Sequence, residues 1–149
     1  MRQSKAISRP EILLIEDNDL DAWKVTRAFG KLGVDRPVTR AYHGAEALEI
    51  LLDERADGSM SPSHVVLLEL NMPRMDGIEC LEALRVESRL AGTPGFVSTT
   101  SGRDADVVAA CRHDVAGYFV KPLSMTEMTT TLRVASGFRG LCELPRMTA

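Results

Sequence analysis

VVLLEL, residues Val65–Leu70, is the stretch that decides the fold, because it is apolar on both faces and is interrupted only by Glu69. A strand of this kind is typical of the centre of a parallel sheet, where helices cover both faces. Four other short apolar runs have the length and composition of strands. They are Glu11–Ile15 (EILLI), Val38–Tyr42, Phe96–Thr99 and Gly117–Val120 (GYFV).

Helical patterns separate these runs, with apolar residues spaced three and four apart. The inner positions of five predicted helices are Ala22, Val25, Phe29 and Leu32; Ala47, Leu48, Leu51 and Leu52; Ile78, Leu81 and Leu84; Val108 and Cys111 within Asp104–Arg112; and Met125, Met128, Leu132 and Ala135. A capping box of Ser124 and Glu127 begins the last helix, and Gly137 ends it. Strands that alternate with helices favour a doubly wound, five-stranded parallel sheet with five helices, a three-layer α/β sandwich of the flavodoxin-like kind.

Length and composition indicate one globular domain. The 149 residues are 44% hydrophobic and 26% charged, and we place the domain at 11–137, between a tail at 1–10 and an extension at 138–149. The net charge of −3 disfavours a nucleic-acid binder, and no apolar run reaches the roughly 18 residues of a membrane span. Cys80, Cys111 and Cys142 lack metal-site spacing, which favours free thiols and a cytoplasmic location.

Polar side chains follow the predicted strands at the point where each strand ends. These residues are Glu16 and Asp17, Glu69 and Asn71, Thr99, and Lys121. The carboxyl ends of parallel strands meet at one edge of a sheet, where such folds bind ligands. Close carboxylates repel one another unless a cation is bound, and their oxygens suit Mg²⁺. With an ammonium and a hydroxyl nearby, this set has the parts that phosphoryl transfer onto a carboxylate needs.

Four motifs resemble the receiver domain of two-component response regulators, which has a CheY-like fold. They are ILLIEDN (12–18), LLELNMPRMDG (67–77), STTS (98–101) and YFVKP (118–122), in an order that covers Ile12 to Gly137. The pattern is most similar to the stand-alone receivers that serve bacterial phytochrome histidine kinases. The resemblance implies a single-domain response regulator of a phosphorelay, which is a signalling module and not an enzyme. Its partners would be a sensor histidine kinase and a downstream protein that the sequence does not identify.

The resemblance also implies a metal site. Glu16 and Asp17 match the acidic pair that holds Mg²⁺, with Asp17 as the more direct ligand, and the backbone carbonyl of Asn71 completes the shell. Glu69 is the fourth member of the predicted metal set, and it stands at the position where the family has the aspartate that accepts phosphate. The longer side chain at this position is expected to weaken the binding of Mg²⁺.

Other matched residues concern the phosphoryl group and the switch. Thr99 and Lys121 match the hydroxyl and the ammonium that support a phosphoryl group. Thr99 and Tyr118 match the pair that moves on switching, and the bond from Lys121 to Pro122 is expected to be cis. These roles are implied by the resemblance and do not follow from spacing alone.

The glutamate at position 69 leaves three interpretations open. Its carboxylate lies roughly 1.5 Å further out than that of an aspartate, the length of one C–C bond, and carries about −1 charge against −1.5 to −2 for a phosphate. Glu69 is then a partial mimic of the phosphorylated state, or part of a phosphorylation-deficient receiver that signals by binding alone. In the third interpretation, Glu69 is a slow acceptor or a neighbouring residue accepts the phosphate in its place. We predict no stable acyl phosphate on this chain.

Parts of the sequence also suggest two alternative functions and one assembly. Asp17-Asn18-Asp19 satisfies the D-x-D pattern of haloacid-dehalogenase-like phosphatases, but the chain lacks room for a cap domain. A flavodoxin-like cofactor binder is disfavoured, because the carboxylates after the first strand would repel a phosphate. The apolar residues Phe138, Leu141 and Leu144 of the extension are interpreted as an arm that supports a homodimer.

Single aromatic and histidine residues are assigned structural places. Trp23 is expected to be half-buried in the core. His43, His64 and His113 are expected at the surface or at strand edges, because they have no cysteine or carboxylate at ligand spacing.

Overall fold

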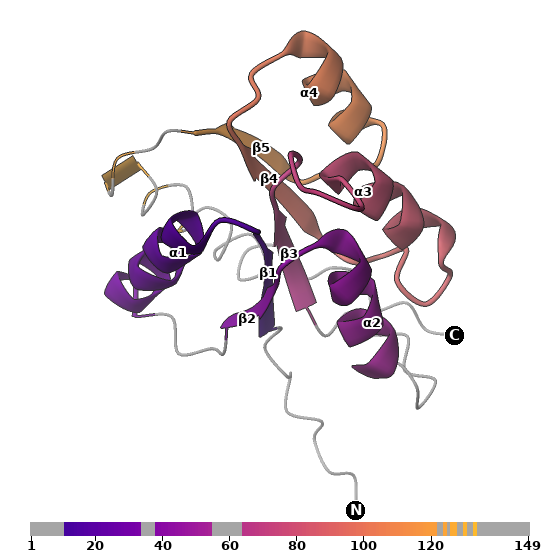
Figure 1. The fold of residues 1–149 in the computed structure, drawn as a ribbon, viewed down its shortest axis with the longest axis horizontal. Coiled ribbons are helices and arrows are strands. Elements are labelled where there is room, and N and C mark those ends of the chain that lie inside the picture. Colours follow the sequence, from indigo (N-terminus) through magenta and orange to yellow (C-terminus); the bar gives the residue numbers. More distant parts are fainter. Residues whose placement is uncertain are drawn as a thin grey trace, which may run out of the picture.

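The computed structural model describes residues 11–33, 38–54 and 64–121, together with 124, 126, 127, 130 and 133. Its centre is one sheet in the order β2-β1-β3-β4-β5, in which every neighbouring pair is parallel (Figure 1). The strands are β1 (Glu11–Ile15), β2 (Val38–Ala41), β3 (His64–Leu68), β4 (Gly95–Thr99) and β5 (Gly117–Val120). The predicted α/β class and five-stranded parallel sheet are confirmed.

The helices with bounds in the described part are α1 (Asp19–Lys31), α2 (Gly44–Glu54), α3 (Gly77–Val86) and α4 (Asp104–Cys111). Figure 1 places α1 on one side of the sheet and α2 and α3 on the other. For the predicted last helix, Glu127 is helical and its backbone N–H donates to Ser124 Oγ at 3.0 Å. The predicted cap at Ser124 is thus confirmed, whereas the four apolar positions predicted for that helix, and Gly137, lie outside the described residues.

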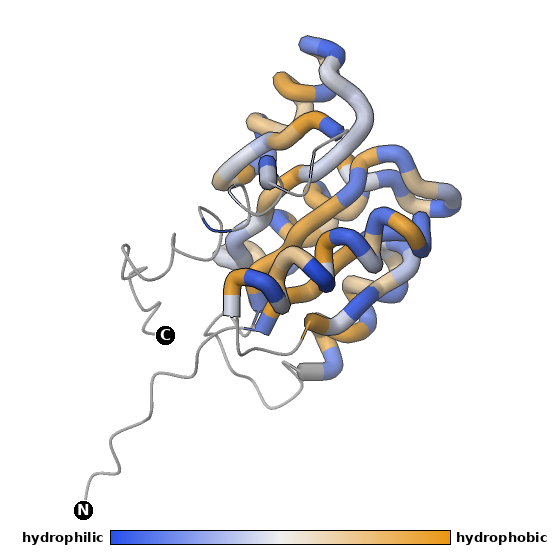
Figure 2. Tube along the Cα trace, turned by 90° about the vertical axis from the view of Figure 1, so that its left-hand side faces the viewer, coloured by the Kyte–Doolittle hydropathy of each residue, from blue (hydrophilic) through white to orange (hydrophobic). Residues whose placement is uncertain are grey.

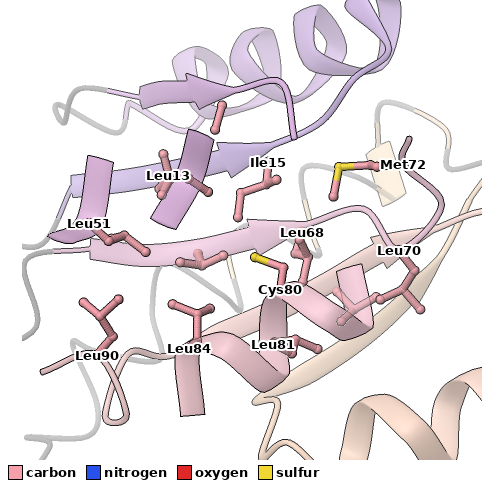
Figure 3. Close-up of a cluster of buried hydrophobic side chains, with 14 of the residues drawn as sticks. Leu13, Ile15, Leu51, Leu68, Leu70, Met72, Cys80, Leu81, Leu84 and Leu90 are labelled. Carbon is pink, nitrogen blue, oxygen red and sulfur yellow. The ribbon is translucent and has the colours of Figure 1, made fainter. Parts of the chain in front are cut away.

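Both faces of the sheet are buried, because successive side chains of a strand point to opposite faces. On β1, Leu13 and Ile15 belong to a cluster with α2 and α3, which Figure 3 shows from within. Ile12 and Leu14 belong to a second cluster with the α1 residue Phe29. Figure 2 shows hydrophobic residues along the strands between the helical layers. The two clusters give the three layers that the sequence predicts.

The loop after β3 is fixed by the start of α3. Asp76 caps this helix, since its Oδ1 accepts from the Glu79 N–H at 2.9 Å. The Gly77 N–H donates to the Leu70 carbonyl at 2.8 Å, and a Cβ atom on Gly77 would lie only 2.6 Å from the Glu69 carbonyl oxygen. Only glycine permits this approach. The first residue of α3 therefore packs directly against the backbone of Glu69 and Leu70 and fixes its course.

The structure corrects two strand ends. β3 ends at Leu68 and not at Leu70, because the chain turns toward Gly77 and leaves the ladder there. Glu69 therefore follows the strand instead of belonging to it. β2 likewise ends one residue before Tyr42, whose side chain is exposed.

The inner side of α4 was predicted wrongly. Val108 is 51% exposed and Cys111 is exposed, whereas Ala110 is the buried residue of this helix. The segment is apolar at five consecutive positions, 107–111, so spacing could not determine which side faces the sheet.

Two further expectations on burial were wrong. Trp23 is 55% exposed, with the Arg27 guanidinium 5.1 Å from its ring, because the inner face of α1 is filled by its neighbours Ala22 and Val25. His64 is buried, since it begins the central strand β3, while His43 and His113 are partly exposed.

Several predictions fall on residues that the structure does not describe. These are the tail at 1–10, the extension at 138–149 with its proposed arm, Cys142 and the bond before Pro122. Among the helices that it does describe, none has the length and apolar character to cross a bilayer.

Candidate functional site

Four polar side chains from different strands are buried together at the carboxyl edge of the sheet. Glu16 follows β1, Glu69 follows β3, Thr99 ends β4 and Lys121 follows β5. Buried charges are costly unless they are paired, and the contacts between these residues account for their burial. The sequence predicted that these residues would meet at this edge, and hydrogen bonds and ion pairs join them here.

Both carboxylate oxygens of Glu69 are engaged. Oε1 accepts from the Thr99 hydroxyl at 2.8 Å and from the Asn71 backbone N–H at 3.0 Å. Oε2 lies 3.0 Å from Lys121 Nζ. The side chain is only 5% exposed, so these contacts take the place of water around its charge.

Lys121 joins three carboxylates. Its Nζ lies 2.6 Å from Glu16 Oε2, 3.0 Å from Glu69 Oε2 and 3.1 Å from Asp21 Oδ2. Burial alone would lower the pKa of Lys121, but the hydrogen bonds and charges of Glu16 and Glu69 raise it above its ordinary value. The ammonium is therefore charged at neutral pH, and the three carboxylates with the one ammonium have a net charge of about −2 as a group of four side chains.

Glu16 has a mixed environment. Burial raises the pKa of its carboxyl, while the hydrogen bond and charge of Lys121 act in the opposite direction. Its second oxygen, Oε1, accepts from the Asn18 backbone N–H at 3.2 Å. The side chain is thus held in place at the end of β1.

The predicted metal ligands fit a hard cation by their chemistry. Carboxylate and carbonyl oxygens with a net negative charge suit Mg²⁺, and Asp17 is exposed beside the buried acids. Within the described residues, however, no group of three acidic, histidine or cysteine side chains is arranged to hold a metal ion. Asp17 takes no part in the contacts described above, and Lys121 engages the carboxylates of Glu16 and Glu69.

Thr99 and Tyr118 are connected through one residue of the loop after β4. The Ser101 backbone N–H donates to Thr99 Oγ1 at 3.3 Å, and the Tyr118 hydroxyl donates to the Ser101 carbonyl at 2.6 Å. The Ser101 hydroxyl also donates to the Asp106 carboxylate at the start of α4. A change at Thr99 therefore has a path of contacts to Tyr118 and to α4.

Two residues at this edge were not predicted from the sequence. Asp21 contacts Lys121 from the first turn of α1, and Arg40 on β2 donates from Nε to the Glu16 carbonyl at 3.0 Å. Arg40 also pairs with Asp19 at 2.8 Å. The signal for Asp21 was its place one turn after the acidic pair, in a helix that begins at the strand end.

Known proteins give the family context. The family model described as the response regulator receiver domain matches residues 12–133 of this chain. Among curated proteins, the probable methanogenesis regulatory protein FilR2 of Methanothrix harundinacea is 36% identical over 121 residues, which are 81% of this chain and 77% of that protein.

Solved structures agree with this match. The phosphorylated cyanobacterial phytochrome response regulator RcpA is 26% identical, with a TM-score of 0.78 over 92% of this chain and 99% of that one. The Mn²⁺-bound form of response regulator Rcp1 is 27% identical, with a TM-score of 0.73 over 91% of this chain and 99% of that one.

Proposed function

The chain belongs to the response regulator receiver domain family, and from this premise we propose that it is a receiver of a two-component phosphorelay in which Glu69 partly replaces a phosphorylated aspartate. The observation that carries the proposal is the pair of contacts from Glu69 to Thr99 and to Lys121, at 2.8 and 3.0 Å. These are the two residues that the family pattern assigns to a phosphoryl group. A glutamate that already holds both has the position of such a mimic.

The electrostatics limit how strong the mimic is. Glu69 brings about −1 charge to a place where a phosphate brings about −1.5 to −2. The Thr99 hydroxyl still donates to one of its oxygens and the Lys121 ammonium lies beside the other, so Thr99 and Lys121 are held against it. We therefore expect a partly active state that does not depend on a phosphate donor.

A divalent ion would be held by Glu16, Asp17, Glu69 and the Asn71 backbone carbonyl. Its chemistry, when bound, is to neutralise negative charge beside Glu69. The net charge of about −2 on Lys121 and its three carboxylate partners supports a cation site, as does the Mn²⁺-bound state of the similar Rcp1. Because Lys121 already engages Glu16 and Glu69, we propose weak binding of Mg²⁺.

The same contacts oppose phosphorylation of Glu69. A nucleophilic oxygen must be free to meet phosphorus in line, and a displacement of about 1 Å can reduce the rate on the order of 100-fold. In this site one oxygen of Glu69 accepts two hydrogen bonds and the other faces an ammonium. The chain is then a receiver that signals without phosphorylation of Glu69.

Phosphorylation is tested with acetyl phosphate and Mg²⁺, with the product read by intact mass. We expect no added phosphate on the native chain and one alkali-labile phosphate on the Glu69→Asp variant, since the shorter acid restores the acceptor. A phosphate gained by the native chain and lost at alkaline pH would contradict the mimic. Failure of the Glu69→Asp variant to gain one would contradict the receiver assignment of this site.

The switch is tested by hydrogen–deuterium exchange of residues 99–120. Glu69→Ala removes both contacts, and we expect faster exchange in this segment, because Thr99 and Lys121 lose their shared partner. Glu82→Gln on the exposed side of α3 is the matched control. Equal exchange in all three proteins would favour the alternative, a phosphorylation-independent pseudo-receiver.

The upstream partner is proposed to be a histidine kinase of the phytochrome type in the cytoplasm. The similarity to the phytochrome response regulator RcpA supports this choice. A homodimer through residues 138–149 is also proposed, from the apolar side chains of that segment. Sedimentation of the full chain and of a chain ending at Gly137 should give a dimer and a monomer, and equal masses would contradict the arm.

A further inference from the structure

We propose that Asp21 is a positioning residue that latches the Lys121 ammonium and withholds it from an incoming anion. An ammonium has three N–H donors, and Lys121 has three carboxylate partners within 3.1 Å. The family pattern explains Glu16 and Glu69 among these partners. Asp21 is the additional acceptor, and it comes from α1 and not from a strand end.

The backbone of Asp21 is held by the helix cap, independently of its contact with Lys121. Asn18 caps α1, and its Oδ1 accepts from the Asp21 backbone N–H at 3.0 Å. The Asp21 side chain is 29% exposed, against 4% for Glu16 and 5% for Glu69. Asp21 is therefore the partner of Lys121 that is most exposed to solvent.

Exchange of partners at Lys121 follows from this order of burial. An anion that approaches Lys121 meets an ammonium that already donates hydrogen bonds to Glu16 and Asp21 and lies 3.0 Å from Glu69 Oε2. The buried contact to Glu16, at 2.6 Å, is the shortest of the three, whereas the contact to Asp21 is the longest and involves the most exposed carboxylate. Asp21 is thus the acceptor that an anion displaces at the lowest cost.

The latch adds a form of control to the proposed function. It rests on that function in one respect, which is that the incoming anion is a phosphoryl group. Without Asp21, the ammonium loses one of its two hydrogen-bond acceptors, and one N–H of Lys121 is open to solvent. The amine is then more accessible to a reagent. With an aspartate restored at position 69, the freed N–H is available to the phosphoryl donor.

The first experiment measures acylation of Lys121 by an amine-reactive ester, with the labelled peptides quantified by mass and Lys24 on α1 as the internal standard. We expect labelling of Lys121 to rise roughly threefold in Asp21→Asn, which keeps a neutral acceptor, and roughly tenfold in Asp21→Ala. Asp19→Ala is the matched control. It removes the same charge from the same turn, but the native Asp19 pairs with Arg40 and not with Lys121. Unchanged labelling in the Asp21 variants, or an equal rise in the control, would overturn the latch.

The second experiment adds Asp21→Ala to the Glu69→Asp variant and follows phosphate uptake from acetyl phosphate. A several-fold faster uptake than in Glu69→Asp alone supports the latch as a limit on phosphorylation, and equal or slower uptake refutes that limit. If neither protein takes up phosphate while Lys121 labelling rises, the latch stands and the proposed phosphorelay function fails. The two ideas therefore fail separately.

Discussion

Lys121→Met should destabilise the chain by about 3–5 kcal/mol at neutral pH, which is the usual effect of removing one member of a buried ion pair. The Lys121 side chain is 7% exposed, and the Glu16 and Glu69 carboxylates that it leaves behind are 4% and 5% exposed. Asp21 is 29% exposed and regains water, so it adds little to the loss. A domain of this size has about 5–15 kcal/mol of stability in all, so the variant loses a large share of it.

The assay is urea unfolding, monitored by circular dichroism in a metal-free buffer. The midpoint should fall while the slope with urea stays constant, since the surface exposed on unfolding does not change. Burial raises the pKa of Glu16, and the hydrogen bond and charge of Lys121 act in the opposite direction. Without Lys121, the folded pKa of Glu16 lies further above the unfolded one, so the stability of the variant should increase as the pH falls from 7 toward 5.

Two comparisons make this prediction decisive. Lys24→Met on α1 removes the same charge from a less buried place and should cost below about 0.5 kcal/mol. Adding Glu69→Gln to Lys121→Met should recover part of the loss, because one of the two stranded charges is gone. A loss below about 1 kcal/mol for Lys121→Met, or no recovery in the double variant, would show that the ammonium does not compensate the buried acids.

Three smaller predictions follow from single contacts. Gly77→Ala should cost at least about 1 kcal/mol in thermal or urea unfolding, because its Cβ would lie 2.6 Å from the Glu69 carbonyl oxygen; unchanged stability would refute the close approach. Thr99→Val should cost about 1–3 kcal/mol by the same assay, since it removes a buried hydrogen bond to a carboxylate; a stabilised variant would contradict that bond. Alkylation of the native chain at pH 8 should label the exposed Cys111 and spare Cys80, because burial raises the pKa of Cys80 to about 12, and peptide mass spectra that show equal labelling would be inconsistent with the described core.

The sheet could be predicted because its signals are local. VVLLEL at 65–70 is apolar on both faces, and such a run has few places other than the middle of a parallel sheet. The positions of Glu16, Thr99 and Lys121 then followed, since every strand of a parallel sheet ends at the same edge. Topology alone brought these three residues together from distant parts of the sequence.

The contacts of α1 and α4 could not be predicted in the same way. Asp21 reaches Lys121 because of the rotation of α1 about its axis, which an acidic first turn does not determine. The face of α4 was misassigned for a related reason, since consecutive apolar residues give no preferred direction, and Val108 lies outward. Side-chain direction depends on packing between elements, and a single sequence carries little information about it.

The contacts of Glu69 with Thr99 and Lys121 affect both the stability of the folded chain and the reactivity of the Glu69 carboxylate. A carboxylate that is buried and paired on both oxygens is stable in the folded chain, and Thr99 and Lys121 supply that pairing. The same pairing makes the oxygens poor nucleophiles, because each would have to give up a partner before it could attack phosphorus. A glutamate at this place therefore cannot be a good mimic and a good acceptor at once, and tighter contacts to Thr99 and Lys121 favour the mimic at the expense of the acceptor.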